Sequence, residues 1–245
     1  NFACLPVDPD GSLRPASTVI QHQGHGVDAS RQKGPHAHSA NFDPAGKRAF
    51  VADLGLDKVM IYDVDAETGK VIPHDPPSAA IEPGRGPRHL AWAPSGQFAY
   101  VITEMGGTVD VFAYDAAKGE LKEVQSITTL PADNTTKPGC AEVVVHPSGK
   151  FVYGSNRGHD SLAIYKVDPT TGKLTSAGWV PTGGKNPRNF VIDPTGGWLL
   201  AANQDSDSIL VFKIDQETGG LSPTGEPVKL PKPVCIRFLP QPSSA

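Results

Sequence analysis

Apolar segments and polar turns alternate along the whole chain, and the pattern repeats about every 50 residues. A turn signal of the form X-Pro-X-Gly follows an apolar segment four times, with its proline at Pro44, Pro94, Pro147 and Pro194. A half-signal with the same spacing ends in Pro240. Repetition at this length is typical of folds built from stacked supersecondary units.

Each turn precedes two short apolar segments that are separated by a polar break. The first segments cover residues 49–52, 99–102, 151–153 and 198–202, and the second cover 58–65, 108–115, 161–168 and 208–215. They contain β-branched and aromatic residues in partial alternation, as half-buried strands do. A glycine-containing hairpin signal closes each second segment, and no unit has a helical period over a helix length. Each unit therefore holds about four short strands.

Four antiparallel strands in a unit of 40–50 residues are typical of a β-propeller blade. We predict an all-β fold, with four full four-stranded blades centred on residues 35–80, 85–130, 138–182 and 186–230 and almost no helix. Residues 3–13 match the third strand and hairpin of another blade, and Val234–Phe238 match the opening strand of a further one. The expected organisation is one propeller domain over residues 1–240, with about four and a half to five blades present and about two blades missing on the N-terminal side. A C-terminal tail follows at 241–245.

Composition agrees with this prediction and excludes several classes of protein. The 245 residues include 26 Gly and 24 Pro, which suits many turns, and 38% hydrophobic residues, which excludes a disordered chain. No apolar run approaches the ~20 residues of a membrane-spanning helix. With 22 Lys+Arg against 26 Asp+Glu and no basic block, we expect no nucleic-acid and no membrane partner. The three cysteines are far apart and predict neither disulfides nor a structural zinc site.

Aligning the units on the turn proline reveals polar residues at matching positions. Six residues before the proline, near the start of the innermost strand, are His38, Arg88, Ala141 and Arg188. Nine and ten residues after it, at the end of the next strand, are four pairs: Asp53/Leu54, Thr103/Glu104, Asn156/Arg157 and Asn203/Gln204. In an antiparallel hairpin the start of one strand lies beside the end of the next, so both positions should share one rim of the central channel.

This alignment predicts a polar cluster at one mouth of the channel. Its members are His38, Arg88, Glu104, Arg157, Arg188, Asn156 and Asn203. Arginine suits carboxylate or phosphate, and His and Glu transfer protons, so the cluster suits an anionic ligand. The alternative is that Arg–Glu pairs only tie blades together. If the cluster is a rim site, Arg88→Ala should abolish anion binding and hardly change the melting temperature. His36 and His38 lie on one face of a strand, but no third ligand has suitable spacing, so we predict no metal.

Five segments of the chain resemble the seven-bladed propeller lactonase family. They are Gly34–Ser39, Gly86–His89, Val101–Glu104, Ser155–Arg157 and Asn186–Phe190. This family includes the propeller type of 6-phosphogluconolactonase and the fungal 3-carboxy-cis,cis-muconate lactonizing enzyme. The resemblance implies seven blades in the complete protein. It also implies that catalysis uses His38 or His36 together with Arg88, Glu104 and Arg157.

Three functions are compatible with these residues. The first is hydrolysis of an anionic sugar lactone, with 6-phosphoglucono-1,5-lactone as the expected substrate and no cofactor. His38, His36 or Glu104 would be the general base, Arg88 and Arg157 would bind the anion and the developing oxyanion, and Arg188, Asn156 and Asn203 would bind substrate.

The second function is cycloisomerisation of a carboxylated muconate, and the third is a non-enzymatic binding platform. The sequence contains no G-x-S-x-G motif, so it does not predict a covalent serine route. We expect a cytoplasmic protein, or a periplasmic one if a signal peptide precedes Asn1, with the oligomeric state left open.

Overall fold

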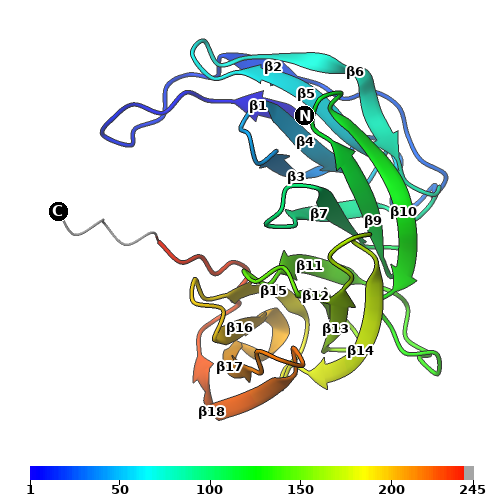
Figure 1. Ribbon diagram of the computed structural model, residues 1–245, viewed down its shortest axis with the longest axis vertical. Helices are drawn as coiled ribbons and strands as arrows, with labels where there is room; N and C mark the ends of the chain where they lie inside the picture. Colours follow the sequence, from blue (N-terminus) through cyan, green and yellow to red (C-terminus); the bar gives the residue numbers. More distant parts are fainter. Residues whose placement is uncertain (240–245) are drawn as a thin grey trace.

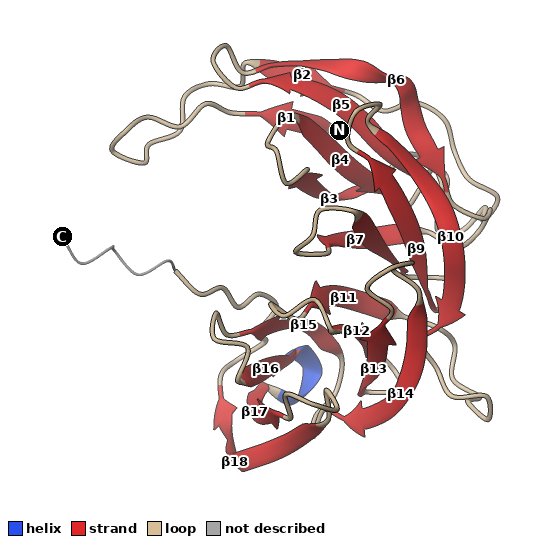
Figure 2. Ribbon diagram, viewed as in Figure 1, coloured by secondary structure: helices blue, strands red, loops and turns tan. Residues whose placement is uncertain are grey.

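Strands dominate the computed structural model, which describes residues 1–239 (Figures 1 and 2). The only helix among these residues is the single 3-10 turn η1 (Gln204–Ser206). The all-β prediction is therefore confirmed. No helix within residues 1–239 has both the length and the apolar character needed to cross a membrane. The predicted tail at 241–245 and the turn residue Pro240 lie outside the described residues.

Sixteen strands form four antiparallel sheets of four strands each, in chain order. The first sheet consists of β3 (Ala37–Phe42), β4 (Arg48–Asp53), β5 (Lys58–Asp65) and β6 (Lys70–Ala80). The second consists of β7 (Pro87–Trp92), β8 (Phe98–Thr103), β9 (Thr108–Asp115) and β10 (Glu120–Thr128). The third consists of β11 (Cys140–Val145), β12 (Phe151–Asn156), β13 (Ser161–Val167) and β14 (Leu174–Pro181). The fourth consists of β15 (Pro187–Ile192), β16 (Trp198–Asn203), β17 (Ser208–Ile214) and β18 (Leu221–Lys229). The predicted positions of the four blades are confirmed.

The sheets follow one another along a curve, as propeller blades do (Figure 1). The first strand of each sheet (β3, β7, β11, β15) lies toward the middle of the curve, and the last (β6, β10, β14, β18) lies on its outer side. Consecutive first strands lie against each other: β3 contacts β7, and β11 contacts both β7 and β15. Side chains on these four strands therefore meet in the middle.

The repeated turn signal forms the link between the first and second strand of each sheet. Its glycine has a positive φ in all four sheets, at Gly46 (68°), Gly96 (71°), Gly149 (73°) and Gly196 (76°). Side chains are disfavoured in this left-handed region, which explains why glycine recurs there. The turn therefore sets the same hairpin in every blade.

Apolar side chains fill the space between neighbouring sheets. Tyr100 and Val111 of the second sheet pack with Val143 and Tyr165 of the third, and all four are at most 3% exposed. Similar clusters join the first sheet to the second and the third to the fourth. Each blade is thus stabilised by burial against the next one, as in other repeat folds.

The two ends of the described chain differ from the full blades. Near the N-terminus, β1 (Phe2–Cys4) pairs only with β2 (Thr18–Ile20), which fits the expected outer half of a blade. The prediction that Val234–Phe238 form an opening strand is wrong for this structure, because no strand is assigned there. A strand needs a neighbour to accept its hydrogen bonds, and the described chain supplies none. Instead, the Ile236 N–H donates to the Asn189 side chain (2.8 Å).

Candidate functional site

A β-bulge interrupts the first strand of every four-stranded sheet. In β3 the pairing passes from Ala37 to Ser39, so that His38 is the extra residue. Arg88 and Arg188 are the extra residues in β7 and β15, and in β11 the irregularity falls between Cys140 and Val143. A bulge redirects a side chain without ending the strand, and bulges are frequent beside active sites. The residues six positions before the turn proline are thus bulge residues.

Three arginines surround the carboxylate of Glu104. Arg88 donates from Nε to Oε2 (3.1 Å), and Arg31 donates from Nη2 to Oε1 (3.1 Å). Arg157 forms an ion pair with Oε2 through its Nη2 (3.0 Å). The predicted convergence of Arg88, Glu104 and Arg157 is therefore present. Arg31 was missed by sequence analysis because it lies in a loop outside the repeated positions.

The positive charges of the surrounding arginines determine the protonation state of Glu104. Burial alone would raise the pKa of Glu104, but attraction by Arg157, Arg88 and Arg31 outweighs burial and lowers it. Glu104 is therefore ionised at neutral pH, and its proton affinity is low. One carboxylate cannot neutralise three guanidinium groups, so the cluster keeps a net positive charge.

Arg88 is far more buried than a rim residue should be. Its side chain is 2% exposed, and its Nη1 donates to the Ala141 carbonyl oxygen (2.5 Å) and to His89 Nε2 (3.2 Å). Burial, followed by repulsion from Arg157, lowers the pKa of Arg88 to about 10. This burial contradicts the premise that the side chain contributes little packing, so we expect its removal to destabilise the protein, because the guanidinium links β7 to Glu104 at the end of β8 and to β11.

His38 lies beside the cluster as a neutral imidazole. Its ring packs against that of His89, with centroids 5.1 Å apart. Burial, together with the positive charge of Arg88, lowers the pKa of His38 to about 4. Its Nδ1 atom is buried and has no hydrogen-bond partner within residues 1–239. In the tautomer that carries the proton on Nε2, this nitrogen can accept a proton from a bound molecule.

A second polar chain links three blades next to the arginine cluster. His89 Nδ1 lies 2.5 Å from Glu142 Oε1, and Asn189 donates to Glu142 Oε2 (2.6 Å). Because Arg88 can only donate to His89 Nε2, the Nδ1–H tautomer of His89 satisfies both contacts. Sequence analysis missed these residues, although all three stand five positions before the turn proline, one position after the residues it selected.

Arg188 supplies a cation that has no acidic partner in the described part of the chain. It is half-buried, and its guanidinium makes no hydrogen bond or ion pair with residues 1–239. Its charge nevertheless contributes to lowering the pKa values of His38 and Arg88. A guanidinium within reach of the cluster and without an acidic partner is available to an anionic ligand.

Two predicted substrate-binding residues are not available to a ligand. Asn156 and Asn203 are fully buried, and their amide groups donate to the carbonyl oxygens of Thr129 (2.7 Å) and Thr182 (2.9 Å). This is a correction to the sequence-based expectation. Side chains alternate along a strand, so when position +10 faces the cluster, position +9 faces the interior of the blade.

His36 does not join His38. It is exposed and precedes β3, and its hydrogen bonds come from the backbone: the N–H donates to Asp53 Oδ1 (2.8 Å) and the carbonyl oxygen accepts from the Leu54 N–H (3.0 Å). The bulge at His38 breaks the alternation that would have placed both rings on one face. Within residues 1–239 no group of three metal-binding side chains is gathered in one place.

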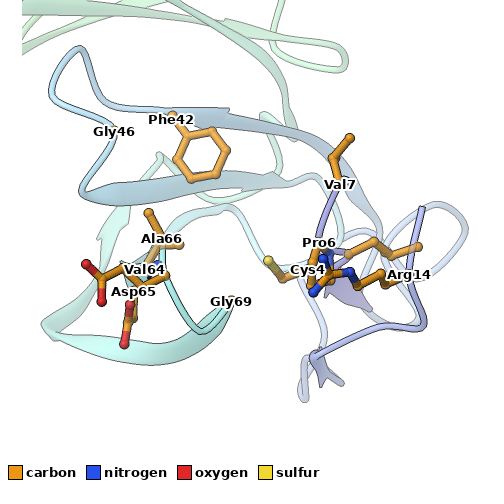
Figure 3. Close-up of a pocket in the computed structure, with 12 residues that line it drawn as sticks. Cys4, Pro6, Val7, Arg14, Phe42, Gly46, Val64, Asp65, Ala66 and Gly69 are labelled. Atoms are coloured by element: carbon orange, nitrogen blue, oxygen red, sulfur yellow. Dashed lines mark hydrogen bonds between the residues drawn. The ribbon is translucent and has the colours of Figure 1, made fainter. Parts of the chain in front are cut away.

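A cavity of about 510 Å³ lies elsewhere, at the N-terminal segment. In Figure 3, Val7 and Arg14 from that segment face Phe42 and Val64 of the first four-stranded sheet across this cavity. The Arg14 guanidinium is already paired with Asp8. None of the arginines around Glu104 lines the cavity, so its size alone does not make it the candidate site.

Comparisons with known proteins identify the family of this chain. A family model described as "Lactonase, 7-bladed beta-propeller" matches residues 1–238. The 6-phosphogluconolactonase of Bacillus subtilis is 38% identical over 241 residues, covering 97% of this chain and 66% of the relative. The 6-phosphogluconolactonase of Pectobacterium carotovorum is 37% identical over 188 residues, covering 77% of this chain and 54% of the relative.

The same relationship appears in three dimensions. The periplasmic gluconolactonase PpgL of Pseudomonas aeruginosa superposes with a TM-score of 0.91 at 36% identity, covering 98% of this chain and 66% of that one. The chain thus spans about half to two thirds of the length of the relatives it matches. With a family model that matches nearly every residue and a fold shared at this level of identity, the chain belongs to the seven-bladed β-propeller lactonase family.

Proposed function

We propose that this protein contributes the active site of a lactonase that hydrolyses an anionic sugar lactone, with 6-phosphoglucono-1,5-lactone as the substrate. The observation that carries the proposal is the group of three arginines around one carboxylate, next to a neutral histidine. A positively charged site suits an anionic substrate, and a neutral imidazole suits the removal of a proton from water. The names of the relatives support the same reaction class.

In this mechanism His38 is the general base. Its Nδ1 atom takes a proton from water while the water oxygen attacks the lactone carbonyl carbon. Negative charge then develops on the former carbonyl oxygen. When the ring C–O bond breaks, His38 returns the proton to the leaving oxygen, and the product is the open-chain acid.

Arg88 and Arg157 stabilise the developing oxyanion. Each has one Nη nitrogen that is not hydrogen-bonded within residues 1–239. Their remaining donors are held by Glu104 and by backbone carbonyl groups, which fixes the two guanidinium groups before substrate arrives. Preorganised donors of this kind stabilise a transition state because they need no reorientation during the reaction.

Glu104 positions the arginines in this scheme and is not the base. A carboxylate with a lowered pKa and three guanidinium partners gains little by accepting a proton. Arg31 and Arg188 bind the phosphate group of the substrate, since both keep donors for it and Arg188 has no other partner within residues 1–239. His36 takes no part, because it is exposed and lies outside the cluster.

The test is direct measurement of lactone hydrolysis. We expect the protein to release 6-phosphogluconate from its lactone well above the spontaneous rate, and Arg157→Ala to reduce kcat/KM by about 100-fold or more. The exposed Arg14→Ala is the matched control and should retain full activity. A rate equal to spontaneous hydrolysis, with a folded protein, would reject the proposal, and the same assay with a carboxylated muconate tests the alternative reaction.

A further inference from the structure

Three buried polar atoms of β3 have no partner within residues 1–239. They are His38 Nδ1, Ser39 Oγ and Asn41 Nδ2. Buried polar atoms are nearly always hydrogen-bonded, so each exception calls for an explanation. Three exceptions within four residues of one strand point to a shared cause.

All three residues line the same cavity of about 380 Å³ in the middle of the curved row of sheets. His89 and Glu142 line it from the second and third sheets, and Arg237 lines it from the C-terminal segment. The volume lies within the ~300–1,000 Å³ range of small-molecule sites. Because His89 also contacts Arg88, the cavity adjoins the arginine cluster.

The chemistry of the lining favours neutral hydroxyl groups. Both Glu142 oxygens are already bonded, to His89 and Asn189, and His38 Nδ1 is assigned to the attacking water, so the groups left to bind a ligand hydroxyl are the Ser39 hydroxyl and the Asn41 amide. A sugar hydroxyl both donates and accepts, and therefore matches each of these groups. Glu142 and Arg237 contribute opposite charges to the lining, so it does not favour a second anion.

We propose that this cavity binds the hydroxyl groups of a polyhydroxylated ligand, while the arginine cluster next to it binds the anionic group. The identity of the ligand as a sugar lactone rests on the proposed function, whereas the binding of a polyol in the cavity is independent of that function.

The kinetic test uses Ser39→Ala and Asn41→Ala. We expect each substitution to lower kcat/KM for the phosphorylated sugar lactone by about tenfold, equal to about 1.4 kcal/mol. Each should also reduce the preference for that substrate over δ-valerolactone, measured as the ratio of the two kcat/KM values, because δ-valerolactone carries no hydroxyl groups. Ser39→Ala should not lower the melting temperature of the ligand-free protein, because the hydroxyl it removes has no partner to lose. Ser176→Ala, on the exposed side of β14, is the matched control and should retain the preference.

The binding test uses sorbitol, a neutral polyol, with the His38 ring resonances as the readout. We expect a saturable shift in the wild-type protein and none in the Ser39→Ala/Asn41→Ala double variant or with ethylene glycol. If the lactone is hydrolysed but both variants keep their preference and sorbitol causes no shift, the cavity assignment is overturned and the lactonase proposal remains. If sorbitol binds as expected but no lactone is hydrolysed, the lactonase proposal fails and the cavity assignment stands.

Discussion

Replacing Glu104 by Gln removes the one negative charge that three arginines share. The side chain is 15% exposed and forms three ion pairs of 3.0–3.1 Å, two of which, with Arg88 and Arg31, are also hydrogen bonds. Breaking a buried ion pair costs about 3–5 kcal/mol, and the lower end applies here because the Gln carbonyl oxygen still accepts hydrogen bonds. For a chain of this length, about 3 kcal/mol corresponds to a melting temperature lower by about 6–12 °C.

An added anion should reverse much of this loss. Phosphate can accept hydrogen bonds from the Nη atoms of Arg88 and Arg157 that have no partner within residues 1–239. It should bind Glu104→Gln more tightly than the wild type, because no carboxylate competes for the arginines. A ligand at 100 times its dissociation constant stabilises a protein by about 2.7 kcal/mol. We therefore expect phosphate to raise the melting temperature of the variant more than that of the wild type. The assay is thermal unfolding in sodium phosphate and in sodium chloride of equal ionic strength.

The stabilisation that Glu104 provides should depend on pH. The pKa of Glu104 is lower in the folded protein than its ordinary value of 4.5, so its stabilising contribution is complete above that value and is lost as the pH falls through the folded pKa. The stability difference between wild type and Glu104→Gln should therefore be largest near neutral pH and shrink in acid. Exposed Glu226→Gln is the control and should behave as wild type. An unchanged melting temperature for Glu104→Gln, or equal effects of phosphate on both proteins, would refute the reasoning.

Three further predictions concern single side chains. His38→Gln should lower kcat by about 10²–10⁴, the range for loss of a general base. Wild-type kcat/KM should fall as the pH drops through about 4, because His38 must be unprotonated. A variant with normal turnover would contradict this role. Arg188→Ala should raise KM for the phosphorylated lactone about tenfold with little change in melting temperature, because its guanidinium has no partner to lose within residues 1–239; an unchanged KM would exclude Arg188 from phosphate binding. Asn156→Ala should lower the free energy of unfolding by about 1–3 kcal/mol, measured by urea denaturation, because its amide holds the Thr129 carbonyl group inside the blade. It should leave KM unchanged. A raised KM in a stable variant would show that Asn156 does bind substrate.

Much of the fold follows from local sequence signals. A proline followed two residues later by a glycine with positive φ specifies the same hairpin four times, and the apolar segments on either side of it specify strands. The opening strand predicted at Val234–Phe238 depends on more than local sequence. Its pattern is that of a strand, but strand formation depends on a hydrogen-bonding neighbour that local sequence does not contain.

Part of the site could be predicted because every blade repeats the same geometry. Counting from the turn proline found Arg88, Glu104 and Arg157, because every blade repeats the same positions. It placed Asn156 on the wrong side, since positions +9 and +10 face opposite ways. It missed His89, because one extra residue in the strand brings position −5 to the channel as well, and the presence of a bulge is not visible in an alternation pattern.

The bulge in each inner strand has a consequence for how such a site can diverge. The extra residue is His38 in one blade, an arginine in two others, and in the remaining blade the irregular stretch includes Ala141. A substitution at this position exchanges a side chain in the channel and leaves strand pairing intact, whereas an insertion elsewhere would turn every following side chain to the opposite face. Each blade thus offers one interchangeable position at the channel mouth, through which a propeller of constant architecture can acquire a different substrate preference one residue at a time.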